Sequence, residues 1–547
     1  MKRYLYLNAA VALSALIFSC NVTSRSEEEI AKKDFGEVAW ENSAIPVRPG
    51  ESATDSFWNK FSERFIYAPA FDFKQIDGAD TYRFEVLSLA DSQRGTFQDP
   101  SPFAPLSPVW TEMPVGSYQL KVVGVAEDGK EIGVSGTREF YRAAPFDGIY
   151  HAPPEMPYAE SAMLALETLL DRDFVQYWLE HGKPDPSYGW YRYPSKIYSA
   201  LVVGAVTQAR LKEGTEAAEE ATKLAQIVAD ELIRISFEKG APYEFFPPTY
   251  HGYPDYFEPG ESHMSYDRSM TIQGADAGHA YLDLYDLTGE EKYLEAAKRI
   301  AGTYLKTQLD NGSWYLYVNN KTGEKIEDNV AIPTAMINYF NRLRKDYEVE
   351  GLEEATEAAL DYVMENPVKT FNWQGQFEDI SARQPYENQS REQACDLAIY
   401  LLKNNRDDPE SVSLAEELIR YSEDQFVIWE RPKPIIAPEK NPGSLPQNWI
   451  TPSVQEQYAY WRPISRAAGI MVDTYWEAYV ATGKERYLAK AKSIANTFPE
   501  VQQYHDGNYV THFTKHKMNF WLNNAVYPAK VLMNFERNLE RLDEESL

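Results

Sequence analysis

The chain has only two cysteines among its 547 residues, Cys20 and Cys395. A framework of several disulfides is therefore excluded as the basis of the fold. After the first 20 residues, no stretch approaches the roughly 20 consecutive apolar residues that a membrane-spanning helix needs. There is no glycine-rich phosphate loop, and Gly260-Glu-Ser262 lacks the closing glycine of a nucleophile elbow. Cysteine pairs and calcium-loop spacings are also missing, so we predict neither a cofactor nor a metal.

Basic residues are scarce relative to acidic ones. Lys and Arg number 54 against 83 Asp and Glu, which gives a formal net charge of −29. Such a field repels nucleic acid and anionic lipid, so we predict no nucleic-acid partner. It would also repel an acidic polysaccharide unless basic residues are concentrated where that substrate binds.

The first 19 residues have the features of a targeting segment. Lys2 and Arg3 precede an apolar run from Ala9 to Phe18, and Ile17-Phe-Ser-Cys20 is similar to a bacterial lipobox. We predict a lipoprotein signal peptide over 1–19, a lipid anchor on Cys20 and a polar tether over 20–60. These features place the protein in the cell envelope, anchored in the outer membrane. An ordinary cleaved signal or a short buried helix is the alternative.

Residues 61–145 alternate between apolar and polar side chains. The pattern is clear in Thr81-Tyr-Arg-Phe-Glu-Val-Leu87 and in Ser117-Tyr-Gln-Leu-Lys-Val-Val123, and glycines punctuate it. Alternation between turn signals predicts antiparallel strands. The segment is similar in pattern to an immunoglobulin or fibronectin type III β-sandwich.

Two stretches of the remaining chain repeat each other 194 residues apart. Tyr285-Asp-Leu-Thr-Gly289 continues into Tyr293-Leu-Glu-Ala-Ala, and Tyr479-Val-Ala-Thr-Gly483 continues into Tyr487-Leu-Ala-Lys-Ala. Glycine ends a helix in the left-handed conformation, and apolar residues with period 3.6 then begin another. The repeated unit is a helical hairpin.

The whole of 150–547 fits a series of such hairpins. Five pairs of helices are predicted, and helices near 155–181 and 519–541 could form a sixth pair across a closed ring. Six pairs make an (α/α)6 toroid, with small and apolar first helices inside and charged second helices outside. An open solenoid is the alternative. The predicted fold is thus mainly α, preceded by the small β-sandwich.

The loops that precede the predicted inner helices are long, aromatic and rich in polar residues. Tyr and Trp are abundant, 38 and 12 in number, and aromatic faces stack on sugar rings, although core packing is the alternative role for each. We predict that these loops line a substrate cleft. The candidate substrate-binding residues are Trp190, Tyr191, Arg192, Trp373, Glu378, Asp379, Asn388, Tyr458, Arg466 and Trp521.

A β-sandwich followed by Thr-Gly-x-x-x-Tyr-Leu hairpins resembles the six-hairpin carbohydrate-active enzymes. These include unsaturated glucuronyl hydrolases, toroid polysaccharide lyases and glucuronyl C5-epimerases. The resemblance covers roughly residues 150–540 and concerns architecture, and no match to the aspartate-bearing tryptophan motif of the glucuronyl hydrolases is found. Together with the leader, it implies a polysaccharide-utilisation lipoprotein like those of Bacteroidetes. The implied substrate is an anionic, uronate-containing poly- or oligosaccharide such as ulvan.

The residue types favour β-elimination on such a substrate. Elimination needs a cation to neutralise the carboxylate, a base for the adjacent proton and an acid for the leaving oxygen. The predicted catalytic residues that supply these groups are His263, Tyr266, Arg268, Tyr460 and Arg462. Hydrolysis would need two carboxylates instead. Hydrolysis remains an alternative, because the candidate loops also contain the carboxylates Asp267, Glu378, Asp379, Glu387 and Glu456. A further alternative is a surface protein that binds glycan without turnover.

The lipid anchor gives the first testable prediction. In Cys20→Ser the thiol that would carry the lipid is gone, so we expect release into the soluble fraction or accumulation of the unprocessed form. Fractionation of cells followed by immunoblotting measures this. A variant that is processed and membrane-bound like the wild type would show that the lipobox assignment is incorrect.

Overall fold

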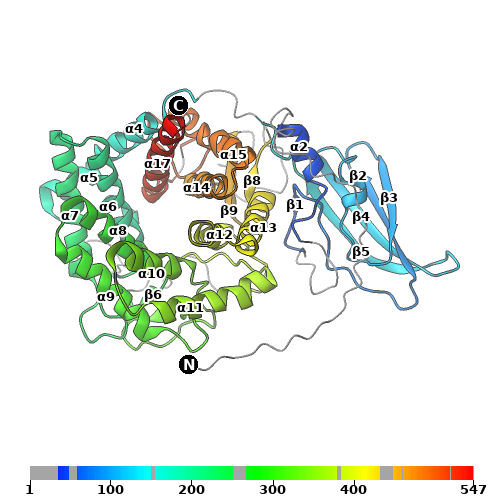
Figure 1. Ribbon diagram of the computed structural model, residues 1–547, viewed down its shortest axis with the longest axis horizontal. Coiled ribbons are helices and arrows are strands. Elements are labelled where there is room, and N and C mark those ends of the chain that lie inside the picture. The colour runs from blue at the N-terminus through cyan, green and yellow to red at the C-terminus, as the bar shows by residue number, and fades with distance from the viewer. Residues whose placement is uncertain are drawn as a thin grey trace.

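A computed structural model describes residues 35–48, 58, 60–148, 154–250, 266–378, 383–430, 448–458, 460–517 and 519–545. Within these ranges, a β-sheet module comes first in the chain and a ring of helices follows (Figure 1). The predicted signal peptide and Cys20 fall outside the described residues. No helix in the described ranges combines the length and the apolar character needed to cross a membrane.

The β module contains one five-stranded sheet with the order β1-β5-β4-β2-β3. All neighbours are antiparallel except β1, which runs parallel to β5. The predicted alternation is realised, because every second residue of β2 is buried. The strands are β1 (Arg64–Phe65), β2 (Thr81–Ser88), β3 (Arg94–Asp99), β4 (Gly116–Val125) and β5 (Glu131–Arg142).

The module differs in one respect from the predicted sandwich. Its described strands form a single sheet, and the buried face is covered by non-strand segments and the short helix α3 (Ser107–Trp110). Trp110 lies parallel to Phe140 on β5, and its indole Nε1 donates to the Ile66 carbonyl at 2.9 Å. Strand alternation requires only that one face be covered, and here aromatic side chains outside the sheet cover it.

The helices after the β module pair into six hairpins that close a ring (Figure 1). Each inner helix contacts the next, and the last, α17, contacts the first, α6. The inner helices are α6 (Pro194–Leu211), α8 (Gln273–Thr288), α10 (Thr334–Tyr347), α12 (Glu392–Asn404), α14 (Ser465–Thr482) and α17 (Asn523–Glu545). Their outer partners, in the same order, are α7 (Glu216–Ile235), α9 (Glu291–Thr307), α11 (Glu353–Val363), α13 (Pro409–Phe426), α15 (Glu485–Ala495) and α4 (Tyr158–Leu170). The pairing of α4 with α17 is the predicted sixth hairpin, and the (α/α)6 toroid is confirmed.

The repeated motif shapes the hairpins as expected. Gly289 and Gly483 follow α8 and α14 with φ of 68° and 67°, and each donates its N–H at 2.7 Å to the carbonyl of the tyrosine four residues earlier. Tyr293 and Tyr487 then lie buried at the start of the outer helices. Shorter helices complete the ring: α5 (Asp173–His181), η2 (Gly189–Arg192), η4 (Met364–Val368) and α16 (Thr497–Gln503).

Small sheets collect at the end of the ring where inner helices begin. Strand β6 (Arg268–Met270) precedes α8 and pairs with β7 (Tyr317–Asn319). Strands β8 (Val427–Ile428), β9 (Ser453–Gln457) and β10 (Tyr460–Pro463) form a second sheet, which runs into α14. These sheets hold the connecting segments over the first turns of the inner helices.

The β module is joined to the ring through α13. The carboxylate of Asp424 accepts the N–H groups of Ile66 and Tyr67 at 2.6 and 2.8 Å, and Arg64 donates to the Asp424 carbonyl at 2.9 Å. Helix α2 (Phe35–Asn42) lies beside this junction in Figure 1. A buried carboxylate that accepts two backbone N–H groups fixes the angle between the two parts.

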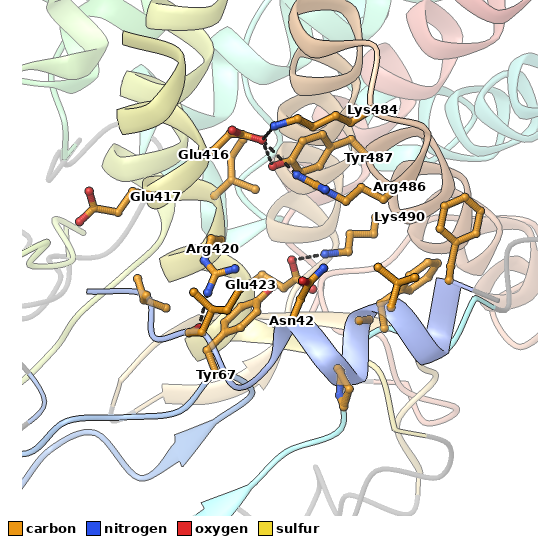
Figure 2. Close-up of a pocket in the computed structure, with 18 of the residues that line it drawn as sticks. Asn42, Tyr67, Glu416, Glu417, Arg420, Glu423, Lys484, Arg486, Tyr487 and Lys490 are labelled. Atoms are coloured by element: carbon orange, nitrogen blue, oxygen red, sulfur yellow. Dashed lines mark hydrogen bonds and ion pairs between the residues drawn. The ribbon is translucent and has the colours of Figure 1, made fainter. Parts of the chain in front are cut away.

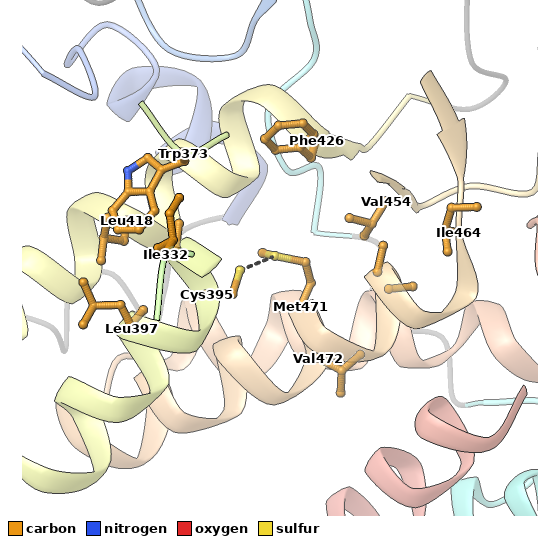
Figure 3. Packing of buried hydrophobic residues seen from close by; sticks show 14 of the residues in the cluster. Ile332, Trp373, Cys395, Leu397, Leu418, Phe426, Val454, Ile464, Met471 and Val472 are labelled. Atoms are coloured by element: carbon orange, nitrogen blue, oxygen red, sulfur yellow. Dashed lines mark hydrogen bonds between the residues drawn. The ribbon is translucent and has the colours of Figure 1, made fainter. Parts of the chain in front are cut away.

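Cys395 packs in the core of the ring, the role predicted from its helical surroundings (Figure 3). Its sulfur lies 3.6 Å from that of Met471 on α14 and 3.4 Å from the Ser422 hydroxyl. Burial raises the pKa of the thiol to about 11, so the reactive thiolate is scarce at neutral pH.

The close approach of the inner helices can be tested with a matched pair of glycine variants. A Cβ added to Gly278 on α8 would lie 2.3 Å from the ring of Tyr339 on α10, whereas a Cβ on Gly302 of α9 meets nothing. We expect Gly278→Ala to lower the free energy of unfolding by about 1–3 kcal/mol through overpacking. Gly302→Ala should raise it by up to about 1 kcal/mol. Denaturant titration measures both, and equal effects would contradict the tight contact between α8 and α10.

Candidate active site

Two adjoining cavities of 170 and 300 Å³ lie over the first turns of the inner helices, and we call them together the ring cleft. Lys196, Phe377 and Glu378 line both. The helix period brings the polar residues of each first turn to one face. The other polar residues that line the cleft are Gln273, Asp276, His279, Thr334, Asn338, Gln376, Arg383, Asn388, Glu392, Gln393, Asp396, Glu456, Gln457, Tyr458, Tyr460, Arg466, Thr511, His512, Asn519 and Asn524.

A lysine–glutamate pair lies where the two cavities meet. The ammonium of Lys196 is 2.6 Å from Glu378 Oε1, and Gln273 Nε2 donates to Glu378 Oε2 at 3.3 Å. Burial lowers the pKa of Lys196, but the Glu378 carboxylate outweighs burial and raises it above the usual value. Lys196 therefore stays charged near neutral pH.

A second ion pair faces the same space. Arg466 Nη2 on α14 lies 2.9 Å from Glu392 Oε1 on α12. Burial alone would raise the pKa of Glu392, yet the charges of Arg466 and of Arg391 lower it below the usual value. Glu392 is therefore an ionised carboxylate near neutral pH.

Two further carboxyls in the cleft have raised pKa values, in contrast to Glu392. Burial and the nearby charge of Glu392 raise the pKa of Asp396 to about 7, although Thr334 Oγ1 donates to its carboxyl at 3.2 Å. Burial raises the pKa of Asp276 to about 6, against the charge of Arg466. Both side chains remain partly open to the cleft. Acid–base catalysis uses carboxyls with different pKa values, because one can then donate a proton while another is ionised.

The mouth of the cleft is aromatic. Trp521 stacks on Trp190 with ring centroids 4.1 Å apart, and the ammonium of Lys196 lies 4.9 Å from the Trp521 ring. Arg462 donates to the Tyr460 hydroxyl at 3.1 Å. A half-buried tryptophan pair beside polar groups suits the apolar face of a sugar ring.

Several sequence-predicted residues come together here. Glu378, Asn388, Tyr458, Tyr460, Arg466 and Trp521 line the cleft, with Trp190 behind Trp521 and Arg462 behind Tyr460. The Tyr458 hydroxyl, however, donates toward Gln425 and Ser62 at the junction with the β module. These hydrogen bonds anchor the loop.

Other predicted residues lie elsewhere. Tyr191 and Trp373 are fully buried and pack in the core, which is the alternative role for a loop aromatic. Tyr266 packs edge-on against Phe237, and Arg268 pairs with Glu327 at 2.8 Å over the Tyr317 ring. Arg192 ends η2 and, among the described residues, is not part of the cleft lining. His263 and Asp379 lie outside the described residues.

Sequence reasoning missed Lys196, Asp276, Glu392 and Asp396. Each lies within the first five residues of an inner helix, whereas most of the predicted site residues lie in the loops before these helices. A signal was present, because a charged residue interrupts an otherwise small and apolar stretch, as in Gln273-Gly-Ala-Asp276-Ala-Gly. Such a residue is directed into the ring, where only another charge or a substrate can satisfy it.

A cavity of 510 Å³ outside the ring differs from the ring cleft in the role of its charged side chains. It lies between α2, α13 and α15, and several of its charged side chains are paired with one another (Figure 2). Lys484 and the Tyr487 hydroxyl bind Glu416 at 2.6 and 2.7 Å, and Lys490 binds Glu423 at 2.6 Å. These pairs tie α15 to α13 and are a structural network. In the described ranges, no three His, Cys, Asp or Glu side chains gather as a metal site would require.

Comparison with known proteins gives structural neighbours only. No protein-family model matches the chain, and no curated protein matches its sequence. A family 76 glycoside hydrolase from a bovine Bacteroides thetaiotaomicron strain is 10% identical, with 84% of this chain and 93% of that chain covered and a TM-score of 0.46. A cellobiose 2-epimerase from Spirochaeta thermophila is 13% identical, with 70% and 98% covered and a TM-score of 0.48.

An unsaturated glucuronyl hydrolase specific for heparin, one of the enzyme types named from the sequence, is 11% identical, with 70% of this chain and 97% of that chain covered and a TM-score of 0.42. The toroid is established by the contacts between its own helices.

The raised pKa of Asp396 predicts a pH-dependent stability. The folded chain keeps this proton up to about pH 7, whereas an unfolded aspartate loses it near pH 4. The folded state therefore binds more protons in that window, and its free energy of unfolding falls as pH rises from about 4 to 7.

Asp396→Asn imitates the protonated form and removes this contribution. We expect the melting temperature of the variant to match the wild type near pH 4.5 and to exceed it at pH 8. Asp286→Asn, at the far end of α8 and half-exposed, is the control and should show no such divergence. Parallel melting curves for Asp396→Asn and wild type across this range would contradict the raised pKa.

Proposed function

We propose that the chain is a carbohydrate-active enzyme that cleaves a glycosidic bond in the ring cleft by acid–base catalysis. One observation carries this proposal: two protonatable carboxyls, Asp276 and Asp396, share a cavity with Glu378 and Glu392, each of which is paired with a basic side chain. Glycoside hydrolysis needs a carboxylic acid to protonate the leaving oxygen and a second carboxyl on the other side of the bond.

The roles follow from the pKa values. Asp396 has the higher one, near 7, and is the proton donor to the leaving oxygen. Asp276, near 6, is mostly ionised at neutral pH and is the second carboxyl, which activates water or stabilises the developing positive charge. The two residues come from α12 and α8, with α10 between these helices in the ring. Lys196 and Arg466 hold Glu378 and Glu392 in place beside them.

The aromatic mouth supports a glycan as the substrate. Trp521, backed by Trp190, offers a flat surface beside Lys196 and Glu378. Catalysis is favoured over binding without turnover because a binding protein has no need of carboxyls poised near neutral pH. The predicted lipid anchor at Cys20 and the outer-membrane location remain part of the proposal.

β-Elimination of a uronate-containing glycan is the second candidate. It is favoured by Tyr460, whose hydroxyl accepts from Arg462 and whose ring lies 6.2 Å from that of His512. Burial and the charge of Arg462 lower the pKa of His512 to about 4, so the imidazole is a neutral base at pH 7. This set could abstract and return protons beside the aromatic mouth of the cleft.

Isosteric variants separate the two candidates. Asp276→Asn and Asp396→Asn should each lower kcat by about 10²–10⁴-fold, because a positioned acid or base contributes that much. Wild-type activity should fall above about pH 7 as Asp396 loses its proton. Asp286→Asn on α8 should retain activity, since it pairs with Arg342 away from the cleft.

Product chemistry decides the reaction class. Hydrolysis yields new reducing ends without ultraviolet absorbance, whereas elimination yields the absorbance of a conjugated 4,5-unsaturated uronate. Full activity in both Asp variants, with rising absorbance and loss of activity in Tyr460→Phe, would replace the hydrolytic proposal with elimination.

A further inference from the structure

Five polar side-chain atoms that line the ring cleft, four amide oxygens and one imidazole nitrogen, have no hydrogen-bond partner among the described residues. They are Gln273 Oε1, Asn388 Oδ1, Gln393 Oε1, Gln457 Oε1 and His512 Nδ1. All five residues are at most 5% exposed. A buried acceptor without a donor is costly, so a cluster of them indicates a ligand that supplies donors.

The orientation of two amides is fixed by their neighbours. Gln273 must turn its NH2 toward the Glu378 carboxylate, to which it donates at 3.3 Å. Asn388 must turn its NH2 toward the Gly375 carbonyl, to which it donates at 3.1 Å. In both residues the oxygen is therefore the atom left without a partner.

The tautomer of His512 is fixed in the same way. Its ring makes a hydrogen bond to the backbone of Pro463, and a proline backbone has only a carbonyl to offer. The imidazole must donate there, and since Nδ1 has no partner, the donor is Nε2. The neutral ring is left with Nδ1 as a buried acceptor at the cleft wall.

The cations of the cleft are already engaged. Lys196 pairs with Glu378 at 2.6 Å, Arg466 with Glu392 at 2.9 Å and Arg383 with Glu387 at 3.6 Å. Five carboxyls line the same space: Asp276, Glu378, Glu392, Asp396 and Glu456. An anionic group entering here would meet paired cations and unpaired acceptors, and a carboxylate or sulfate has only acceptors to add.

We infer that the substrate of the ring cleft is a neutral, hydroxyl-rich glycan, whose sugar hydroxyls donate to these unpaired acceptors, and not a uronate-containing or sulfated one. The inference rests on the proposed function, whose site it specifies further. It departs from the anionic substrate implied by the sequence resemblance. Because a site built to bind a donor rejects an analogue without it, the acceptors also select against uronate at the same positions.

Binding to an inactive enzyme tests the inference separately from catalysis. The probes for isothermal titration calorimetry on full-length Asp276→Asn are cellotetraose, mannotetraose, β-1,4-galactotetraose and xylotetraose. Tetragalacturonate and a glucuronate-containing tetrasaccharide are the anionic counterparts, and chitosan tetraose is the cationic one. We expect at least one neutral tetrasaccharide to bind at least about tenfold more tightly than every charged one. Its affinity should be unchanged between 50 and 500 mM NaCl, since no net charge is neutralised.

A matched pair of variants on α12 tests the acceptors themselves. Gln393→Met keeps the shape of the side chain and removes its amide, and it should weaken binding of the neutral ligand by about 2- to 10-fold. Asn404→Leu, at the last residue of the same helix and away from the cleft, should leave binding unchanged. Asn388→Leu is the second cleft variant, and melting temperatures confirm that each variant is folded.

Each outcome has a meaning. Tighter binding of a uronate or of chitosan tetraose, or binding by none of the probes, overturns the inference. An unchanged affinity in both Gln393→Met and Asn388→Leu also overturns it. Binding of a neutral glycan that wild-type enzyme fails to cleave leaves the inference standing and contradicts the proposed catalysis instead.

Discussion

The contact between α17 and α6 is the constraint on which the rest of the structure depends. These helices come from opposite ends of the helical part of the chain, and their contact converts a row of hairpins into a closed ring. The approach is tight, because a Cβ on Gly204 of α6 would lie 2.8 Å from Val526 of α17. Closure directs the first turns of six inner helices toward one space. Without it, Lys196, Asp276 and Arg466 would lie on separate helices with no common cavity.

The ring then sets the electrostatics of its own centre. Charged side chains that face inward lose solvent, which is costly unless each charge finds a partner. Lys196 with Glu378 and Arg466 with Glu392 provide such partners. Asp276 and Asp396 have no cation of their own in an ion pair among the described residues, and burial favours their protonated forms. Structural charge pairs and candidate catalytic acids thus follow from the same closure.

Much of this fold could be predicted from the sequence. The Thr-Gly-x-x-x-Tyr repeat located the hairpins because α8 and α14 each end in a left-handed backbone conformation, at Gly289 and Gly483. Few residues other than glycine adopt this conformation without strain. Alternation located β2 and β4, but it could not show that helix α3 and loop aromatics, in place of a second sheet, cover the buried face. Local patterns specify elements, whereas the covering of a face depends on contacts distant in sequence.

The site could be predicted less well. Loop composition led to Trp521, Glu378 and Asn388, which do line the cleft, but equally to Tyr191 and Trp373, which fill the core. A loop that supplies an aromatic side chain to the cleft has the same kind of sequence as one that supplies it to the core. Only the folded ring shows which role each side chain has. The carboxyls Asp276 and Asp396 lie inside helices, where a polar residue is ordinarily on a solvated face. Their function becomes visible only when inward and outward faces are known.

The most direct test of the account is the position of a bound sugar. A crystal of Asp276→Asn soaked with the neutral tetrasaccharide that binds it most tightly should show the glycan in the ring cleft. We expect one glycosidic oxygen within hydrogen-bond distance of Asp396, and sugar hydroxyls against Gln273 and Asn388. Density for the sugar on the β module or in the cavity between α2, α13 and α15, with the ring cleft empty, would contradict the account.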